Sequence, residues 1–283
     1  MNAFARSWEV AKLSFSVIGQ DRELLLFPIL GGLFSLLYTA AILVPGFFIL
    51  RPMDGSTEVN QALAYAGLFV LYLGLAFLAT FFNTCVVYTT KVRFEGGDAS
   101  FGESLSFAFS MIHLIFAWSL VAATVGILLR ALDQLGERFG AIGRMVIGIL
   151  HSILGLAWSV VTIFVVPSMV YHGLGPIDAV KRSTAVLRRT WGESLIRHFG
   201  LGILQFLGVL LGIFGFGALL VASGGGTPAM VVVALAVVYF IALAAVFSVA
   251  NTIFNTALYV YADSGQVPSG YNREIMQEAI RPR

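Results

Sequence analysis

The chain has 283 residues, of which 58% are hydrophobic and only 11% are charged. A soluble domain carries about 25% charged residues, so the 17 basic and 15 acidic residues of this chain are too few to cover an aqueous surface. With a mean hydropathy of +0.90, the composition excludes a soluble globule and predicts that the bilayer is the main solvent. The formal net charge of +2 is too small for a nucleic-acid-binding surface, so no nucleic-acid partner is expected.

Residues 1–23 are predicted to form an amphipathic helix at the membrane surface. Apolar residues recur there at steps of three and four, whereas charged residues occupy the other side of the helical wheel. The apolar set is Phe4, Trp8, Ala11, Phe15 and Ile18, and the polar set includes Arg6, Glu9 and Lys12. Because these charges interrupt the apolar run, the segment lacks the pattern of a cleaved signal peptide.

Six membrane spans follow, because long stretches free of Asp, Glu, Lys and Arg exceed the roughly 20 residues that cross a bilayer. The last stretch is divided into two spans by Ser223-Gly224-Gly225-Gly226-Thr227-Pro228, which predicts a turn. The predicted spans are 26–49, 62–89, 110–130, 145–171, 199–222 and 229–261. The whole chain is thus predicted to form one all-α polytopic membrane domain, with a tail at 263–283.

An even number of spans places both termini on the same side of the membrane. Only Arg51, Arg130, Arg138 and Arg144 lie on the opposite side, and the other 13 of the 17 basic residues lie on the terminal side. The positive-inside rule therefore predicts cytoplasmic termini and a cytoplasmic tail.

The spans show signs of an internal repeat of about 86 residues. Ser100-Phe101-Gly102-Glu103-Ser104-Leu105 matches Thr190-Trp191-Gly192-Glu193-Ser194-Leu195, and each segment has the spacing of a capping box where a helix begins. Phe82-Asn83-Thr84-Cys85 and Phe254-Asn255-Thr256-Ala257 end spans 2 and 6, with Val165-Val166-Pro167-Ser168 between them. We interpret these matches as three parallel helical hairpins, in which Pro167 kinks span 4. Coincidence between helix-start sequences is the alternative.

Residues 172–190 are predicted to form a basic amphipathic helix on the cytoplasmic side. Ile177, Val180, Thr184, Leu187 and Trp191 would form its apolar face. The candidate contacts for a lipid headgroup or a protein partner are Trp8, Lys181, Arg182, Arg188, Arg189 and Trp191. Simple anchoring at the membrane surface is the alternative role.

Polar side chains within the spans are mostly amides. Asn83, Gln205, Asn251 and Asn255 are candidates either for a polar cavity or for hydrogen bonds that pair the helices. Gly208 and Gly212 form a Gly-x-x-x-Gly pair that allows close helix packing, within the protomer or between protomers. The single cysteine, Cys85, is expected to be a buried packing residue.

The sequence contains no pattern typical of an active site. Charged residues are missing from the span centres, and the four histidines have no recognisable metal-ligand spacing. Neither Gly-x-Ser-x-Gly nor a phosphate-binding glycine loop occurs. We therefore expect no enzymatic activity, no metal and no cofactor.

Three segments carry a resemblance to known sequences. The chain's opening, including Asp21-Arg22-Glu23-Leu24, and its ending, including Pro268-Ser269-Gly270-Tyr271, resemble an uncharacterised family of prokaryotic multipass integral membrane proteins. The segment from Gly173 to Ser183 is similar to one shared by several such families. The resemblance implies a prokaryotic plasma membrane location and says nothing about mechanism.

Two functional hypotheses remain open at this stage. The first is a non-enzymatic scaffold or accessory subunit, whose partners are membrane lipids and either another protein or a second copy of the chain. The alternative is a transporter or channel that moves a small solute or lipid along an axis lined by the amides. The first predicts a dry helical core, and the second predicts a hydrated cavity.

Overall fold

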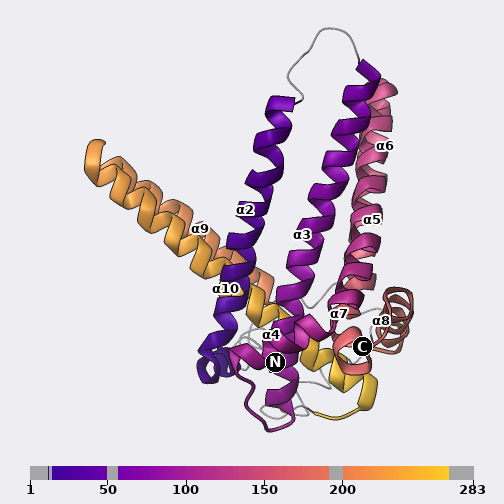
Figure 1. Cartoon of the computed structure of the whole chain (residues 1–283). Helices are drawn as coiled ribbons and strands as arrows, with labels where there is room; N and C mark the ends of the chain where they lie inside the picture. The colour runs from indigo at the N-terminus through magenta and orange to yellow at the C-terminus, as the bar shows by residue number, and fades with distance from the viewer. Residues whose placement is uncertain (1–11, 13–14, 50–56, 191–199, 268–283) are drawn as a thin grey trace. The chain divides into compact units, whose positions relative to one another are not determined.

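The computed structural model describes residues 12, 15–49, 57–190 and 200–267, and these residues form helices and short connections without a strand. After a helical stretch at 15–20, the elements are η1 (Arg22–Leu25), α2 (Leu26–Ile49), α3 (Thr57–Phe94), α4 (Phe101–Ser110), α5 (Ile112–Arg138), α6 (Gly140–Thr162), α7 (Val165–His172), α8 (Pro176–Thr190), α9 (Gly200–Ala222) and α10 (Gly226–Ser264) (Figure 1). The chain is therefore all-helical in its described parts.

Six of these helical segments are long and apolar enough to cross a membrane. They are Arg22–Phe47, Ala62–Phe94, Ile112–Gly136, Ile142–His172, Leu201–Ala222 and Gly226–Ser264. Each overlaps one predicted span, so the prediction of a six-helix membrane protein agrees with the structure. Spans 4 and 6 begin earlier than predicted because Gly143, Arg144 and the turn residues around Pro228 are helical.

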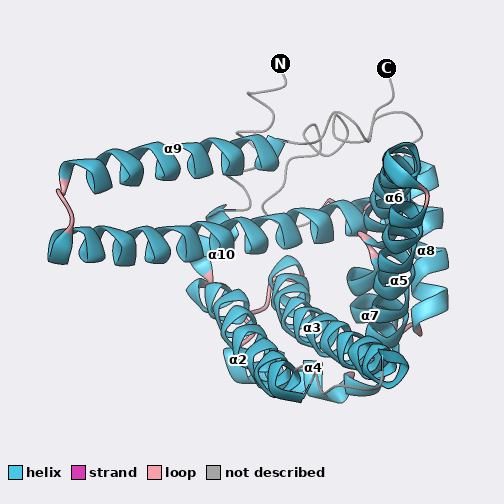
Figure 2. Ribbon diagram, turned by 90° about the horizontal axis from the view of Figure 1, so that it is seen from above, coloured by secondary structure: helices cyan, strands magenta, loops and turns pink. Residues whose placement is uncertain are grey.

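The chain forms two compact units, which are described separately. The first contains residues Met1–Ile29, Thr89–Phe101 and Val186–Arg283, and the second contains Leu30–Tyr88 and Gly102–Ala185. In the first unit, α9 and α10 form an antiparallel hairpin, visible side by side in Figure 2. The helical stretch 15–20 and η1 lie against α10, where the rings of Phe15 and Phe247 meet edge to face.

In the second unit, α5 and α6 form another antiparallel hairpin, and Trp118 stacks on Trp158 between them. A small core joins α3 to α7. It contains Val87, Val166 and Val170, with Tyr88, Phe107 and Tyr171 packed against it. The ring of Tyr88 stacks on that of Phe107, which brings α4 to the same core.

Each hairpin has two ends that differ in burial. We call the end at the hairpin connection (50–56, Phe139 or 223–225) the turn end, and the other the base end. On α10, the buried residues lie between Ala245 and Tyr259, at the base end, whereas large apolar residues between Met230 and Ile241 are exposed. On α3, burial begins at Thr80. The turn ends thus present the apolar surface that a bilayer covers.

Span 4 is interrupted at Ile163 and Phe164, between α6 and α7. Pro167 lies in the first turn of α7, where its missing N–H and its ring cannot continue the preceding helix. The kink predicted from Pro167 is therefore present as a break one turn before it. The Asn-Thr segments of α3 and α10, which the predicted repeat aligns with Pro167, are continuous helix.

Candidate functional site: a charged cluster and a basic helix at the base ends

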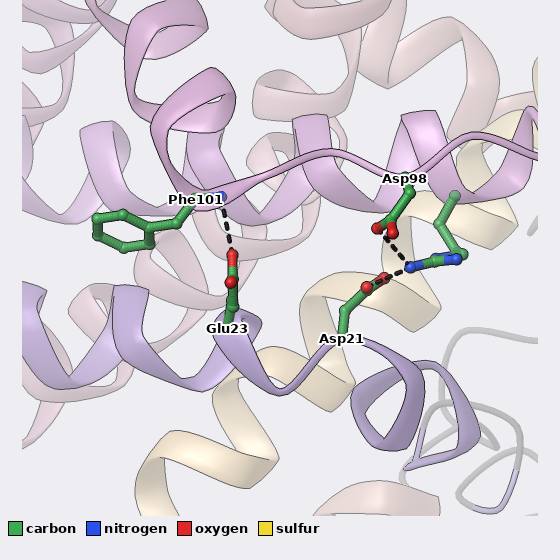
Figure 3. A network of polar contacts seen from close by, with 5 residues as sticks. Asp21, Glu23, Asp98 and Phe101 are labelled. Carbon is green, nitrogen blue, oxygen red and sulfur yellow. Dashed lines mark hydrogen bonds and ion pairs between the residues drawn. The ribbon is translucent and has the colours of Figure 1, made fainter.

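A cluster of charged residues ties together separate segments of the first unit (Figure 3). Arg93, near the end of α3, donates from Nε to Asp21 Oδ2 at 2.6 Å, and its Nη2 contacts Asp21 Oδ1. The same Nη2 donates to Asp98 Oδ1 at 2.8 Å. Asp21 is 9% exposed and Arg93 is 24% exposed, so this guanidinium bridges two carboxylates in a partly desolvated place.

The turn after α3 positions Asp98 for this contact. Gly97 N–H donates to Val92 O at 2.9 Å and Gly96 N–H donates to Arg93 O at 3.1 Å, which is the Schellman pattern of helix ends. Gly96 has φ +84°, in the left-handed region that glycine tolerates. A Cβ at Gly97 would lie 2.8 Å from Val92 Cγ1, so this turn needs both glycines.

Glu23 connects η1 to the start of α4. Its Oε2 accepts a hydrogen bond of 2.8 Å from the backbone N–H of Phe101, one of the amides that a helix start leaves unpaired. The ring of Phe101 stacks on Phe27 with centroids 4.9 Å apart. Helix α4 begins at Phe101, which agrees with the predicted capping sequence at Ser100, whereas the matching sequence at 190–195 lies almost entirely outside the described residues.

The contacts of this cluster join chain segments to one another. The Asp21 carboxylate is held by two guanidinium nitrogens, and Glu23 accepts from a helix amide. Removing one partner of such a buried ion pair lowers the free energy of unfolding by about 3–5 kcal/mol, because the remaining charge is left buried without compensation. The cluster therefore fixes the segment before α2 against the α3–α4 connection.

A second polar contact bridges the break in span 4. Ser183 on α8 donates from Oγ to Val161 O at 2.6 Å and accepts from Phe164 N–H at 3.3 Å. These are backbone groups that the α6–α7 break leaves without their usual helical partners. One hydroxyl thus satisfies a donor and an acceptor, and it attaches α8 to the break.

Helix α8 buries a face that coincides only in part with the predicted one, because Leu187 belongs to both and Val180 and Thr184 are half-buried. Ala179 and Ser183 are completely buried, Val186 and Leu187 are 3% and 6% exposed, and Ile177 is 67% exposed. Ile177 therefore does not belong to the covered face. Lys181 and Arg188 are exposed on the opposite side, Lys181 forms an ion pair of 3.1 Å with Asp178, and Arg182 is half-buried. The side chain of Arg189, and Trp8 and Trp191, lie outside the described residues.

The predicted amides lie in both units. Asn251 and Asn255 are half-buried on one face of α10, and Gln205 is half-buried on α9 of the same unit. Asn83, also half-buried, is on α3 in the other unit. The hydroxyls near them bond locally: Thr256 donates to Thr252 O and Thr84 donates to Thr80 O, each four residues earlier.

Gly208 and Gly212 lie on the face of α9 that contacts α10. A Cβ at Gly212 would be 2.5 Å from Tyr239 Cε1, and a Cβ at Gly208 would be 3.0 Å from Leu243 Cδ1. The Tyr239 hydroxyl donates to Gly208 O at 2.9 Å. The same arrangement occurs between α2 and α3, where Tyr38 donates to Val70 O at 2.6 Å and lies over Gly74.

Comparison with known protein families finds one family to which the chain is similar. A model described as a family of unknown function, DUF6159, matches residues 62–270. The chain belongs to this family. The region that matches DUF6159 contains Arg93, Asp98, α8 and the four amides, whereas Asp21 and Glu23 precede it. No curated protein and no solved structure matches the chain at a significant level.

Sequence reasoning missed the Asp21–Arg93 contact and the role of Ser183. Asp21 and Glu23 lie in the segment that carries the resemblance, and no local sequence pattern pairs either of them with the end of α3. The available signal was a Gly-Gly turn followed by Asp98 directly after a charged helix end. Ser183 offered no signal, because a serine four residues after Ala179 on a helix is ordinary.

Proposed function

We propose that this member of DUF6159 is a non-enzymatic membrane scaffold or accessory subunit. The supporting observation is that the charged residues of the cluster bind one another or the backbone. Arg93 binds Asp21 and Asp98, and Glu23 accepts from the first amide of α4. Ionisable groups that move protons or activate substrates need an open bonding position, whereas these groups join chain segments. Charged residues that hold the base ends rigid are typical of a protein that binds partners in the membrane without performing chemistry.

The competing function is a transporter or channel for a small solute or lipid. The observation that favours it is the half-buried pair Asn251 and Asn255, which lie four residues apart on one face of α10. Amides with one side toward solvent could line a polar path. Gln205, on the neighbouring α9, would lie along the same hairpin.

Flux through reconstituted vesicles separates the two functions. Purified protein is placed in liposomes that contain a small fluorescent solute and a fluorescent lipid analogue, and solute leakage and lipid flip are followed together. The scaffold proposal predicts rates equal to those of protein-free vesicles. A faster rate that Asn251→Leu/Asn255→Leu abolishes, while Thr227→Val at the exposed turn leaves it unchanged, would establish transport instead.

The architecture that we infer is a threefold repeat of one short helix followed by a hairpin. The helical stretch 15–20, α4 and α8 precede the three hairpins in turn. At matching positions of spans 2, 4 and 6, Cys85, Ser168 and Ala257 are small and completely buried. Equal burial at these three positions supports the repeat. It is tested by exchanging Cys, Ser and Ala among the three positions, which the repeat predicts the fold tolerates.

We place the chain in the plasma membrane with both termini in the cytoplasm, and we place α8 and the N-terminal helix at that surface. The distribution of basic residues supports this orientation. A fluorescent reporter that folds only in the cytoplasm should be active at the C-terminus and inactive when inserted at Phe139. The reverse result would require the opposite orientation.

A further inference from the structure

Helix α8 separates its apolar and basic sides. Its covered face consists of Ala179, Ser183, Val186 and Leu187, each at most 6% exposed. Lys181 and Arg188, seven residues apart, are exposed, and Arg182 lies on the flank of the same side. We call these three residues the basic face. Because protein already covers the apolar side, α8 has no free apolar stripe to insert among lipid tails.

The chain holds this helix beside the membrane. Span 4 ends at His172, and only Gly173, Leu174 and Gly175 separate it from α8. Gly173 has φ +61° and ends α7 in the left-handed conformation, which redirects the chain. Ser183 then attaches α8 to the backbone of Val161 and Phe164, within the same span. Two connections therefore keep the basic face close to the headgroup layer.

We propose that the basic face of α8 binds the phosphate groups of anionic lipids. The partner is identified by charge complementarity and by the short connection between α8 and a membrane span. Binding would be electrostatic and would weaken with salt, because exposed charges are screened. Each basic residue near an anionic membrane surface adds about fivefold to the affinity. Asp178, paired with Lys181 at 3.1 Å, competes with the lipid phosphate for that ammonium group.

Native mass spectrometry of the full chain in a neutral detergent measures this binding directly. The protein is titrated with phosphatidylglycerol, and with phosphatidylcholine as the zwitterionic comparison. Lys181→Gln/Arg188→Gln should weaken phosphatidylglycerol binding by about 25-fold, the product of two fivefold losses. Asp178→Asn should strengthen it several-fold, because the competing carboxylate is gone.

The matched control removes the same number of charges at a turn end. Arg138 and Arg144 are exposed there, so Arg138→Gln/Arg144→Gln should leave phosphatidylglycerol binding at α8 unchanged. All three variants alter exposed side chains, and unchanged thermal unfolding verifies their fold.

Three results would overturn the proposal. One is equal weakening by both double variants, and another is equal affinity for the two lipids. The third is an unchanged phosphatidylglycerol affinity in the double variant Lys181→Gln/Arg188→Gln. If this variant also loses a discrete protein adduct, formed in cells by a photoreactive group at Ile177, the basic face binds an acidic protein instead.

Discussion

The apolar residues at the base ends and at the turn ends of the long helices have different environments. On α10, the large apolar residues between Met230 and Ile241 are mostly exposed, whereas the apolar residues between Ala245 and Tyr259 are mostly buried and alternate with polar residues such as Asn251 and Asn255. The base ends also hold the bridging polar contacts of Arg93 and Ser183. Both regions of α10 fall within one predicted span, and packing shows which part faces lipid and which part belongs to a protein core.

Helix length explains why the two regions differ. A helix rises 1.5 Å per residue, so α3, with 38 residues, is about 57 Å long, and the hydrocarbon layer is about 30 Å thick. One end must therefore leave the hydrocarbon. On α3 that end carries Lys91 and Arg93, and the apolar residues that precede them are buried, namely Phe81, Phe82, Cys85, Val86 and Val87.

The largest expected effect comes from breaking the charged cluster. Arg93→Leu leaves Asp21 buried without its partner, and should lower the free energy of unfolding by about 3–5 kcal/mol. Arg144→Leu, at an exposed turn-end site, should change it by less than about 0.5 kcal/mol. Unfolding by SDS in mixed micelles measures both variants. The double variant Asp21→Leu/Arg93→Leu should recover part of the loss, and strict additivity would contradict the pairing.

The next effect tests the tyrosine and glycine contacts in the hairpins. Gly212→Ala places a methyl group 2.5 Å from Tyr239 Cε1, so the ring must move and the hydrogen bond to Gly208 O weakens. We expect a loss of about 1–3 kcal/mol. The matched control is Gly215→Ala on the same helix, which meets nothing within 4 Å and should be neutral or stabilising. Equal effects in the same unfolding assay would refute the close packing.

A comparable or smaller loss is expected at the break in span 4. Ser183→Ala leaves Phe164 N–H and Val161 O without the hydroxyl, and should cost about 1–3 kcal/mol. Ser152→Ala removes a hydroxyl that bonds only to Gly148 O of its own helix, and should have little effect. Hydrogen exchange at Phe164 should rise in Ser183→Ala alone. Unchanged exchange there would mean that the hydroxyl does not cap the break.

The smallest effect concerns Ser168, whose Oγ is buried and has no hydrogen-bond partner among the described residues. Replacing this hydroxyl by hydrogen removes an unpaired polar group, so Ser168→Ala should be neutral or stabilise the fold by up to about 1 kcal/mol. Thermal unfolding in detergent compares it with Ser183→Ala. A clear loss of stability would mean that Ser168 bonds to a group outside the described part of the chain.

The sequence predicted the spans well because each depends on a long local run of apolar residues. Pro167 likewise acts on its own helix, so its break could be expected. The Asp21–Arg93 contact joins residues 72 positions apart, and no local pattern encodes such a pairing. On α8, hydrophobicity predicts Ile177 on the covered face together with Leu187, but Ile177 is exposed, and the small side chains of Ala179 and Ser183 allow the close approach to the protein instead. The roles of Asn83, Gln205, Asn251 and Asn255 stay predictions.

The division between base ends and turn ends can be tested on one helix without any mutation. The protein is reconstituted with lipids that carry a photoreactive diazirine in the acyl chain, and labelled residues of α10 are mapped by mass spectrometry. Labelling is predicted between Met230 and Ile241 and absent between Ala245 and Tyr259. Uniform labelling along α10, or labelling confined to its base end, would contradict the assignment of the turn ends to lipid and the base ends to a protein core.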